Sequence, residues 1–177
     1  MPQSLVRFDY GFGVVGESRK HGARRAKPGL INSPSAANNV VGRAFTQAAA
    51  GGTVQAGGTG IFAGILSNPK QYASYGSGSG GPLGATITLP NNSLAEFTEE
   101  DYALVVAMTN ANVGIGDYVV FLQADGTLQS VAPGSAIPAG CTRILGAVVN
   151  DLPQPTANGL CTISMTGPLS GGPAGSD

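Results

Sequence analysis

Short apolar segments separated by turn residues make up most of the chain from residue 40 onward. Eight of these segments have the length and spacing of β-strands: residues 61–66, 83–89, 93–98, 102–108, 117–123, 127–131, 143–149 and 160–165. Residues 83–89 alternate apolar side chains with small or polar ones, the period-two pattern of a strand with one buried face. Short strands at this spacing favour a sandwich or a barrel.

Turn residues predict how some of these segments pair. Asp125-Gly126 stands between residues 117–123 and 127–131, and Asp-Gly between two apolar runs is a strong hairpin signal. Asn91-Asn92 tolerates left-handed backbone, which predicts a second hairpin between residues 83–89 and 93–98. One helical turn could begin at Thr98, with the acids that follow at its positive end.

Composition agrees with an all-β chain. The 177 residues include 28 glycines and 12 prolines, and only 11% are charged, against about 25% in typical soluble domains. Glycine and proline break helices, and few charged residues are available to line the solvent-facing side of a helix. We therefore predict a small jelly-roll or barrel-like β domain over residues 40–166, preceded by an extended arm, residues 1–39, and followed by a flexible Gly/Pro/Ser tail, residues 167–177.

Charge is divided unevenly between the arm and the rest of the chain. Residues 1–43 hold seven basic and two acidic residues, a net charge of +5, whereas the remainder holds two basic and eight acidic residues, a net charge of −6. Residues 16–29 show no hydrophobic periodicity, so we expect them to be extended and to become ordered only on a partner. A long basic segment near a terminus is typical of interaction tails, although a solvated tail is the alternative.

Residues that could perform chemistry are sparse. Gly11 to Gly16 spell GxGxxG, but a basic, glycine-broken segment follows where a dinucleotide site needs a helix, so we interpret them as a glycine-rich strand. His21 is the sole histidine and lies in the arm, which removes the base from any Ser-His-Asp or Cys-His arrangement. The acids at Glu99 to Asp101 fit a solvated turn better than a catalytic pair. We expect no enzyme activity and no cofactor.

The two cysteines, Cys141 and Cys161, lie in strand-like segments, where a buried free thiol is the common outcome. Their spacing from each other and from His21 matches no metal motif, so we expect no metal site. The chain has no apolar run long enough to span a bilayer and no secretory signal at its start, which predicts synthesis in a cytoplasm without membrane insertion.

Nucleic-acid binding is disfavoured. The arm has the arginines and lysines that phosphates require, but no aromatic residues are interleaved with them for base stacking, and the sequence pI is about 5.7. An acidic protein surface explains the arm equally well.

The order of segments resembles the structural cement proteins of tailed-phage heads. The resemblance rests on residues 54–70, Gly116 to Phe121, Asp125 to Leu128 and residues 144–149, and it covers most of residues 38–166. It implies a compact β domain that clamps neighbouring major capsid subunits from outside the shell, as a virion component with no catalytic residues. It also implies a small symmetric oligomer, with a dimer favoured over a trimer, and no small-molecule substrate.

On this interpretation the arm supplies the contacts to the capsid. The candidates are its exposed basic side chains, which we expect to meet acidic capsid residues: Arg19, Lys20, Arg24, Arg25 and Lys27. Two other classes remain open. A fibre, tail or adhesion module would expose aromatic residues, of which the chain has only 6%. A nucleic-acid-binding accessory protein would bind with a steep salt dependence.

Overall fold

A computed structural model describes residues 12–20, 22–48, 51–68, 87–110, 112–152 and 159–166. These residues form one antiparallel sheet of nine strands, in the order β3-β2-β4-β5-β9-β8-β6-β7 with β1 also paired to β5. The strands are β1 (Arg25–Leu30), β2 (Ala44–Gln47), β3 (Val54–Ala56), β4 (Phe62–Leu66), β5 (Leu94–Ala107), β6 (Tyr118–Leu122), β7 (Leu128–Val131), β8 (Cys141–Asp151) and β9 (Leu160–Thr166), with one 3-10 turn, η1 (Ala36–Asn38).

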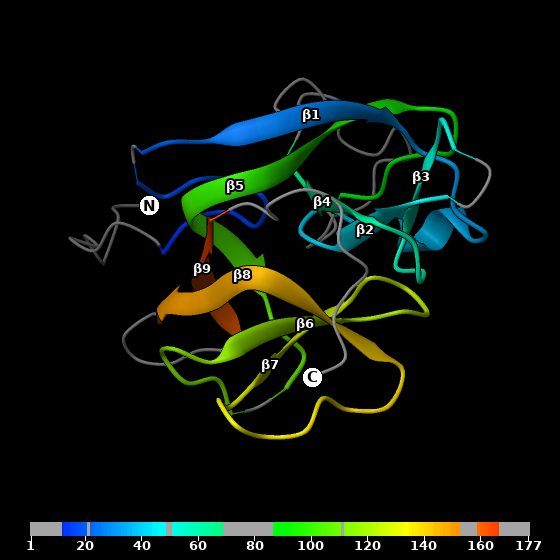
Figure 1. Cartoon of the computed structure of the whole chain (residues 1–177). Helices are drawn as coiled ribbons and strands as arrows, with labels where there is room; N and C mark the ends of the chain where they lie inside the picture. The colour runs from blue at the N-terminus through cyan, green and yellow to red at the C-terminus, as the bar shows by residue number, and fades with distance from the viewer. Residues whose placement is uncertain are drawn as a thin grey trace, which may run out of the picture.

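The sheet curls into a half-barrel because β5 is long and bent (Figure 1). Its first half pairs with β1 on one edge and β4 on the other, and its second half pairs with β9. The register shifts between Asp101 and Leu104, where the strand turns from one half of the sheet to the other. The all-β, barrel-like prediction is confirmed.

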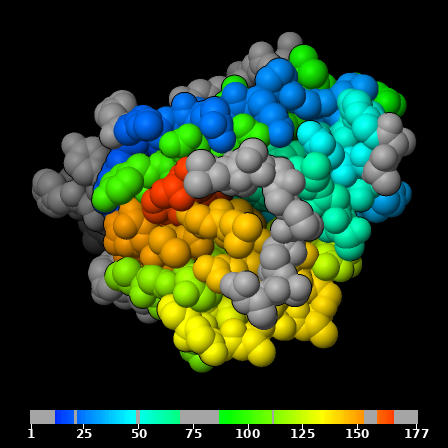
Figure 2. All heavy atoms as spheres, in the orientation of Figure 1, coloured from blue at the N-terminus to red at the C-terminus, as the bar shows by residue number. Residues whose placement is uncertain are grey.

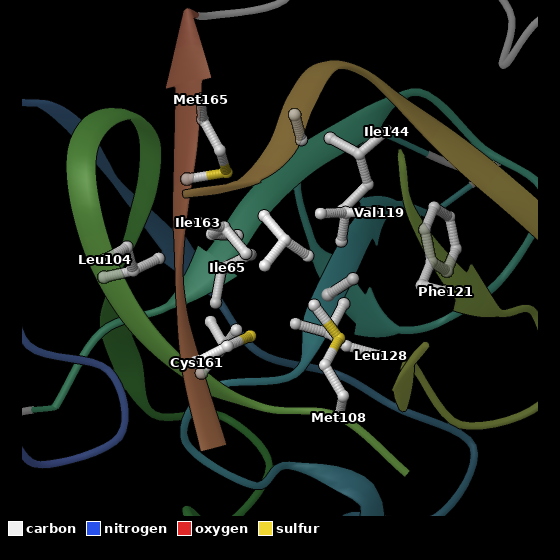
Figure 3. Close-up of a cluster of buried hydrophobic side chains, with 14 residues drawn as sticks. Ile65, Leu104, Met108, Val119, Phe121, Leu128, Ile144, Cys161, Ile163 and Met165 are labelled. Carbon is white, nitrogen blue, oxygen red and sulfur yellow. The ribbon is translucent and has the colours of Figure 1, made fainter. Parts of the chain in front are cut away.

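Two hydrophobic clusters fill the two halves. The larger cluster includes Leu104, Phe121 and Ile163, together with Ile65 from β4 (Figure 3). The smaller one includes Phe45 and Phe97, whose ring centroids are 5.0 Å apart. Neighbouring residues of β2 and β4 point into different clusters, so these two strands are buried on both faces and join the two halves into one body.

Five predicted strands are confirmed as β4, β6, β7, β8 and β9, and the Asp125-Gly126 hairpin is confirmed between β6 and β7. Three predictions around β5 are wrong. Residues 93–98 and 102–108 belong to one strand, and no helical turn begins at Thr98. Residues 93–98 do not pair with residues 87–89, because Thr88 pairs with Val40 instead; residues 83–86 lie outside the described part of the chain.

The strands β1, β2 and β3 were not predicted. Each has six residues or fewer, and β1 contains a proline and a glycine. The predicted tail, residues 167–177, lies outside the described residues. Among the residues described, no helix is long and apolar enough to cross a membrane.

Candidate interaction surface

Residues 16–20 and 22–30, which we call the strap, run antiparallel along the whole length of β5. The amide of Gly16 donates to the carbonyl of Val105 at 2.9 Å, and the amide of Arg19 donates to the carbonyl of Ala103 at 2.9 Å. The strap then continues as β1 on the first half of β5. Figure 2 shows the strap, in blue, along one edge of the molecule next to β5, in green.

This placement corrects one expectation about the arm. Residues 25–30 of the strap form strand β1 and residues 16–19 hydrogen-bond to β5, so the strap is ordered on this chain's own β5 and not only on a partner. Residues 1–11 and His21 lie outside the described residues. Pro28 fits the position because β1 is an edge strand, where a residue without an amide donor breaks no ladder.

Acidic residues of the body hold the strap through ion pairs. The guanidinium of Arg19 lies 2.7 Å from the carboxylate of Asp151 in β8. On β5, the Glu99 carboxylate contacts Arg25 Nε at 3.2 Å and Lys27 Nζ at 2.7 Å. The side chain of Glu99 is only 15% exposed, so this cluster is less screened by solvent than a surface pair.

Arg24 connects the strap to the bend of β5. Its Nη2 donates to Glu96 at 2.6 Å, and its Nε lies 3.9 Å from Oδ2 of Asp101. Asp101 is buried, and its Oδ1 accepts hydrogen bonds from Ser18 Oγ at 3.0 Å and from the Ala103 amide at 2.8 Å. Asp101 thus contacts the strap at Ser18 and at Arg24, where β5 changes register.

Two of the acids interpreted above as a solvated turn, Glu99 and Asp101, are therefore partners of the basic strap, and all three from Glu99 to Asp101 lie in β5. Glu99 gains two cations from the strap, and Asp101 gains a hydrogen bond from Ser18. The sequence held a signal for this pairing, because the excess positive charge of residues 1–43 nearly matches the excess negative charge that follows.

Lys20 differs from the other four candidates. Arg19, Arg24, Arg25 and Lys27 each contact a carboxylate of the same chain. Lys20 is exposed and makes no ion pair within the described residues; its Nζ lies 5.8 Å from the ring centroid of Tyr102, which is 55% exposed. Of the five candidates, Lys20 alone has no carboxylate partner in the described part of the chain.

The remaining candidate chemistry fits a structural role. The amide of Gly16 hydrogen-bonds to β5. The residues after Gly16 continue along β5 as the strap, whereas a dinucleotide site would need a helix there. Both cysteines are free; burial raises the pKa of Cys161 to about 12 and also raises the pKa of Cys141. In the described ranges, no three His, Cys, Asp or Glu side chains gather in a way that could hold a metal ion.

Comparison with known proteins adds the family. The sequence profile of the family described as "Structural cement protein (E217 gp24/Pam3 gp6)" matches residues 1–166. A chain in the solved structure titled "The capsid of Myoviridae Phage XM1" has a similar fold, with a TM-score of 0.59 and 15% sequence identity over 93% of this chain and 96% of that one. A search of curated proteins gave no match. The family match extends over both the strap and the β body, and this chain therefore belongs to the phage structural cement proteins.

Proposed function

We propose that this protein binds the outer surface of a tailed-phage head and cements neighbouring major capsid subunits. The observation that carries the proposal is the family match over residues 1–166. The proteins of this family are structural, in agreement with the expectation that the chain is not an enzyme. As a member of the family, the protein is a component of the phage capsid.

The architecture suits a rigid clip. A thin shell fails at the contacts between its subunits, so a protein that bridges several of them raises the barrier to their separation. The strands β2 and β4 contribute side chains to both clusters, and the strap is paired with β5. These contacts hold the described strands in one arrangement before the protein binds. A preordered surface loses little conformational entropy when it binds, and many copies on one head multiply a modest contact.

We further propose that the basic side chains of the strap face acidic residues of the capsid. Four of the five candidates share their charge with this chain's own carboxylates, so Lys20 carries the larger part of the proposed attraction. Deleting residues 1–30 is a poor test, because it would remove β1 and expose the edge of β5. Single substitutions separate binding from folding.

The test is co-sedimentation of the purified protein with expanded heads that lack cement protein, with unexpanded heads and free duplex DNA as controls. Saturable binding to expanded heads is the expected result, and its plateau gives the copy number. Retention on DNA without binding to heads would overturn the proposal.

The same assay compares Lys20→Gln with Lys27→Gln, which removes an equal charge that is paired with Glu99. We expect Lys20→Gln to weaken binding to heads by about 2–5-fold, the range of an exposed ion pair, and Lys27→Gln to weaken it less. Equal losses of affinity in the two variants would show that a carboxylate partner within this chain does not reduce the contribution of a basic side chain to head binding.

We also propose that the protein self-associates, as a dimer in preference to a trimer. The support is an exposed apolar pair at the end of the β1–β5 ladder, where Leu30 lies opposite Leu94 and the two side chains are 38% and 67% exposed. Burying such a patch against its own copy is the simplest use of a self-complementary surface. Sedimentation equilibrium distinguishes the dimer from the monomer and the trimer.

A further inference from the structure

Arg143, in β8, is the one arginine of the described residues that contacts no carboxylate of those residues. The other four, Arg19, Arg24, Arg25 and Arg43, lie 2.7, 2.6, 3.2 and 3.6 Å from a carboxylate oxygen. The part of the chain that follows residue 43 holds eight acidic residues and only two basic ones, so the absence of a partner for Arg143 is not explained by a shortage of carboxylates.

The fold fixes the position of the Arg143 guanidinium. Ile144 points into the larger cluster, so Arg143 lies on the opposite, outer face of the sheet, where its register partner is Val120 of β6. The guanidinium carbon lies 3.5 Å from the ring centroid of Tyr118. Stacking on an aromatic ring orients the planar group and leaves its edge for hydrogen bonding.

A cavity of about 430 Å³ opens beside this guanidinium. The connection from β7 to β8 folds back over the outer face, and the cavity lies between that connection and the strands. Its lining is mixed: Val120, Val131 and Ile137 lie beside the charged group of Arg143 and the hydroxyl-bearing side chains of Tyr118 and Ser135. The apolar residues of such a site can contact the methylene groups of a ligand, and the arginine can bind the charged end of that ligand.

The Nε atom of Arg143 is buried and has no hydrogen-bond partner. Buried donors are nearly always paired in folded proteins, because an unpaired donor loses its hydration without compensation. Because Nε is enclosed, a carboxylate in the cavity would accept from the two terminal nitrogens of the guanidinium together, a two-pronged geometry that arginine favours.

We propose that this cavity, the Arg143 pocket, binds a carboxylate of a neighbouring protein subunit on the head, presented by an Asp or Glu side chain. The inference rests on the proposed function, which places capsid protein against this chain. The side chains of Val120, Val131 and Ile137 favour a protein side chain over a nucleic-acid phosphate, since they match the methylene groups that carry the carboxylate.

Two variants test the pocket in the head-binding assay. Arg143→Gln removes the charge, and Arg143→Lys keeps the charge but lacks the planar two-pronged group. We expect both to weaken binding to expanded heads by at least tenfold, since truncating a desolvated charged contact is costly, with Lys27→Gln as a control that removes a charge already paired in the strap. Wild-type binding together with unchanged affinity of both variants would overturn the inference and leave the proposed function standing.

A second measurement uses the wild-type protein alone, so it depends neither on heads nor on the folding of a variant. Sodium acetate is titrated into the full-length chain while the arginine Nε–Hε signals are followed by NMR. We expect a saturable shift of the Arg143 signal that exceeds the shift of the Arg24 signal, because Arg24 is already paired with Glu96. Equal, non-saturating shifts would contradict the pocket, and failure of the wild type to bind heads would contradict only the proposed function. Duplex-DNA binding that is lost in Arg143→Gln would also overturn the carboxylate assignment.

Discussion

Gly126 has two roles at the scale of the single residue. It gives the β6–β7 turn a positive φ of 78°, the role expected of Asp-Gly in a hairpin. It also lies against β2, where the Ala44 amide donates to its carbonyl at 2.9 Å and the Gly57 amide donates to the carbonyl of Ala44 at 3.0 Å. A Cβ at position 126 would collide with the Ala44 carbonyl oxygen. The turn therefore also fastens one half of the barrel to the other.

The substitution Gly126→Ala tests this second role against Gly134→Ala. Gly134 also has a positive φ, 80°, but a Cβ there would meet nothing within 4 Å. Both variants bear the backbone cost of about 1–2 kcal/mol, and we expect Gly126→Ala to lose about 1–3 kcal/mol more because it overpacks the contact. Urea unfolding measures the difference. Equal losses would mean that the contact with Ala44 contributes nothing to stability.

Cys161 makes stability depend on alkaline pH. Burial raises its pKa from 9.0 to about 12 in the folded protein, so the folded state keeps a proton that the unfolded state loses. The stabilisation of the protonated thiol is complete below pH 9 and is lost as the pH rises toward 12. We expect wild type to lose about 1 kcal/mol more than Cys161→Ala between about pH 8 and about pH 10. Parallel pH profiles of the unfolding free energy for the two proteins would contradict this.

At the scale of the element, β5 organises the molecule and the strap depends on its bend. Asp101 holds Ser18, the Ala103 amide and Arg24 at the point where β5 changes register. Since the Asp101 side chain is 1% exposed and Glu96 is 57% exposed, the two carboxylates around Arg24 have different weights. Buried hydrogen-bonded charges cost far more to remove than exposed ones.

We therefore expect Asp101→Ala to lower the unfolding free energy by about 2–4 kcal/mol and Glu96→Ala to lower it by about 1 kcal/mol or less. Hydrogen exchange locates the effect. The Arg19 amide, bonded to the Ala103 carbonyl, should exchange faster in Asp101→Ala than in Glu96→Ala. If both variants exchange alike at Arg19, Asp101 does not hold the strap.

The hydrophobic pattern of the sequence was sufficient to predict five of the nine strands. The strands β4, β6, β7, β8 and β9 were predicted because each is an apolar run bounded by turn residues. The pattern could not predict β1, because its alternation is interrupted by Pro28 and Gly29 and its pairing depends on charges distant in sequence. The pattern predicted two separate strands in place of β5, because three successive acids resemble a solvated turn when their partners are not known.

At the scale of the whole molecule, the opposite charges of the two parts of the chain meet within the fold. The sequence predicted that the basic residues would meet acids of the capsid, and it could not show that four of the five candidates pair with acids of the same chain. It also could not single out Lys20 or Arg143, because their lack of a carboxylate partner among the described residues is visible only when side chains are placed. Most basic side chains of the described residues are therefore already paired before the protein meets a capsid.

A cement protein strengthens the shell to which it binds. This is tested most directly by the disruption temperature of expanded, cement-free heads, followed by release of encapsulated dye, with and without saturating protein. We expect heads with bound protein to release the dye at a higher temperature, and the increase to follow occupancy until the sites are filled. Saturated binding that leaves the disruption temperature unchanged would contradict a cementing function.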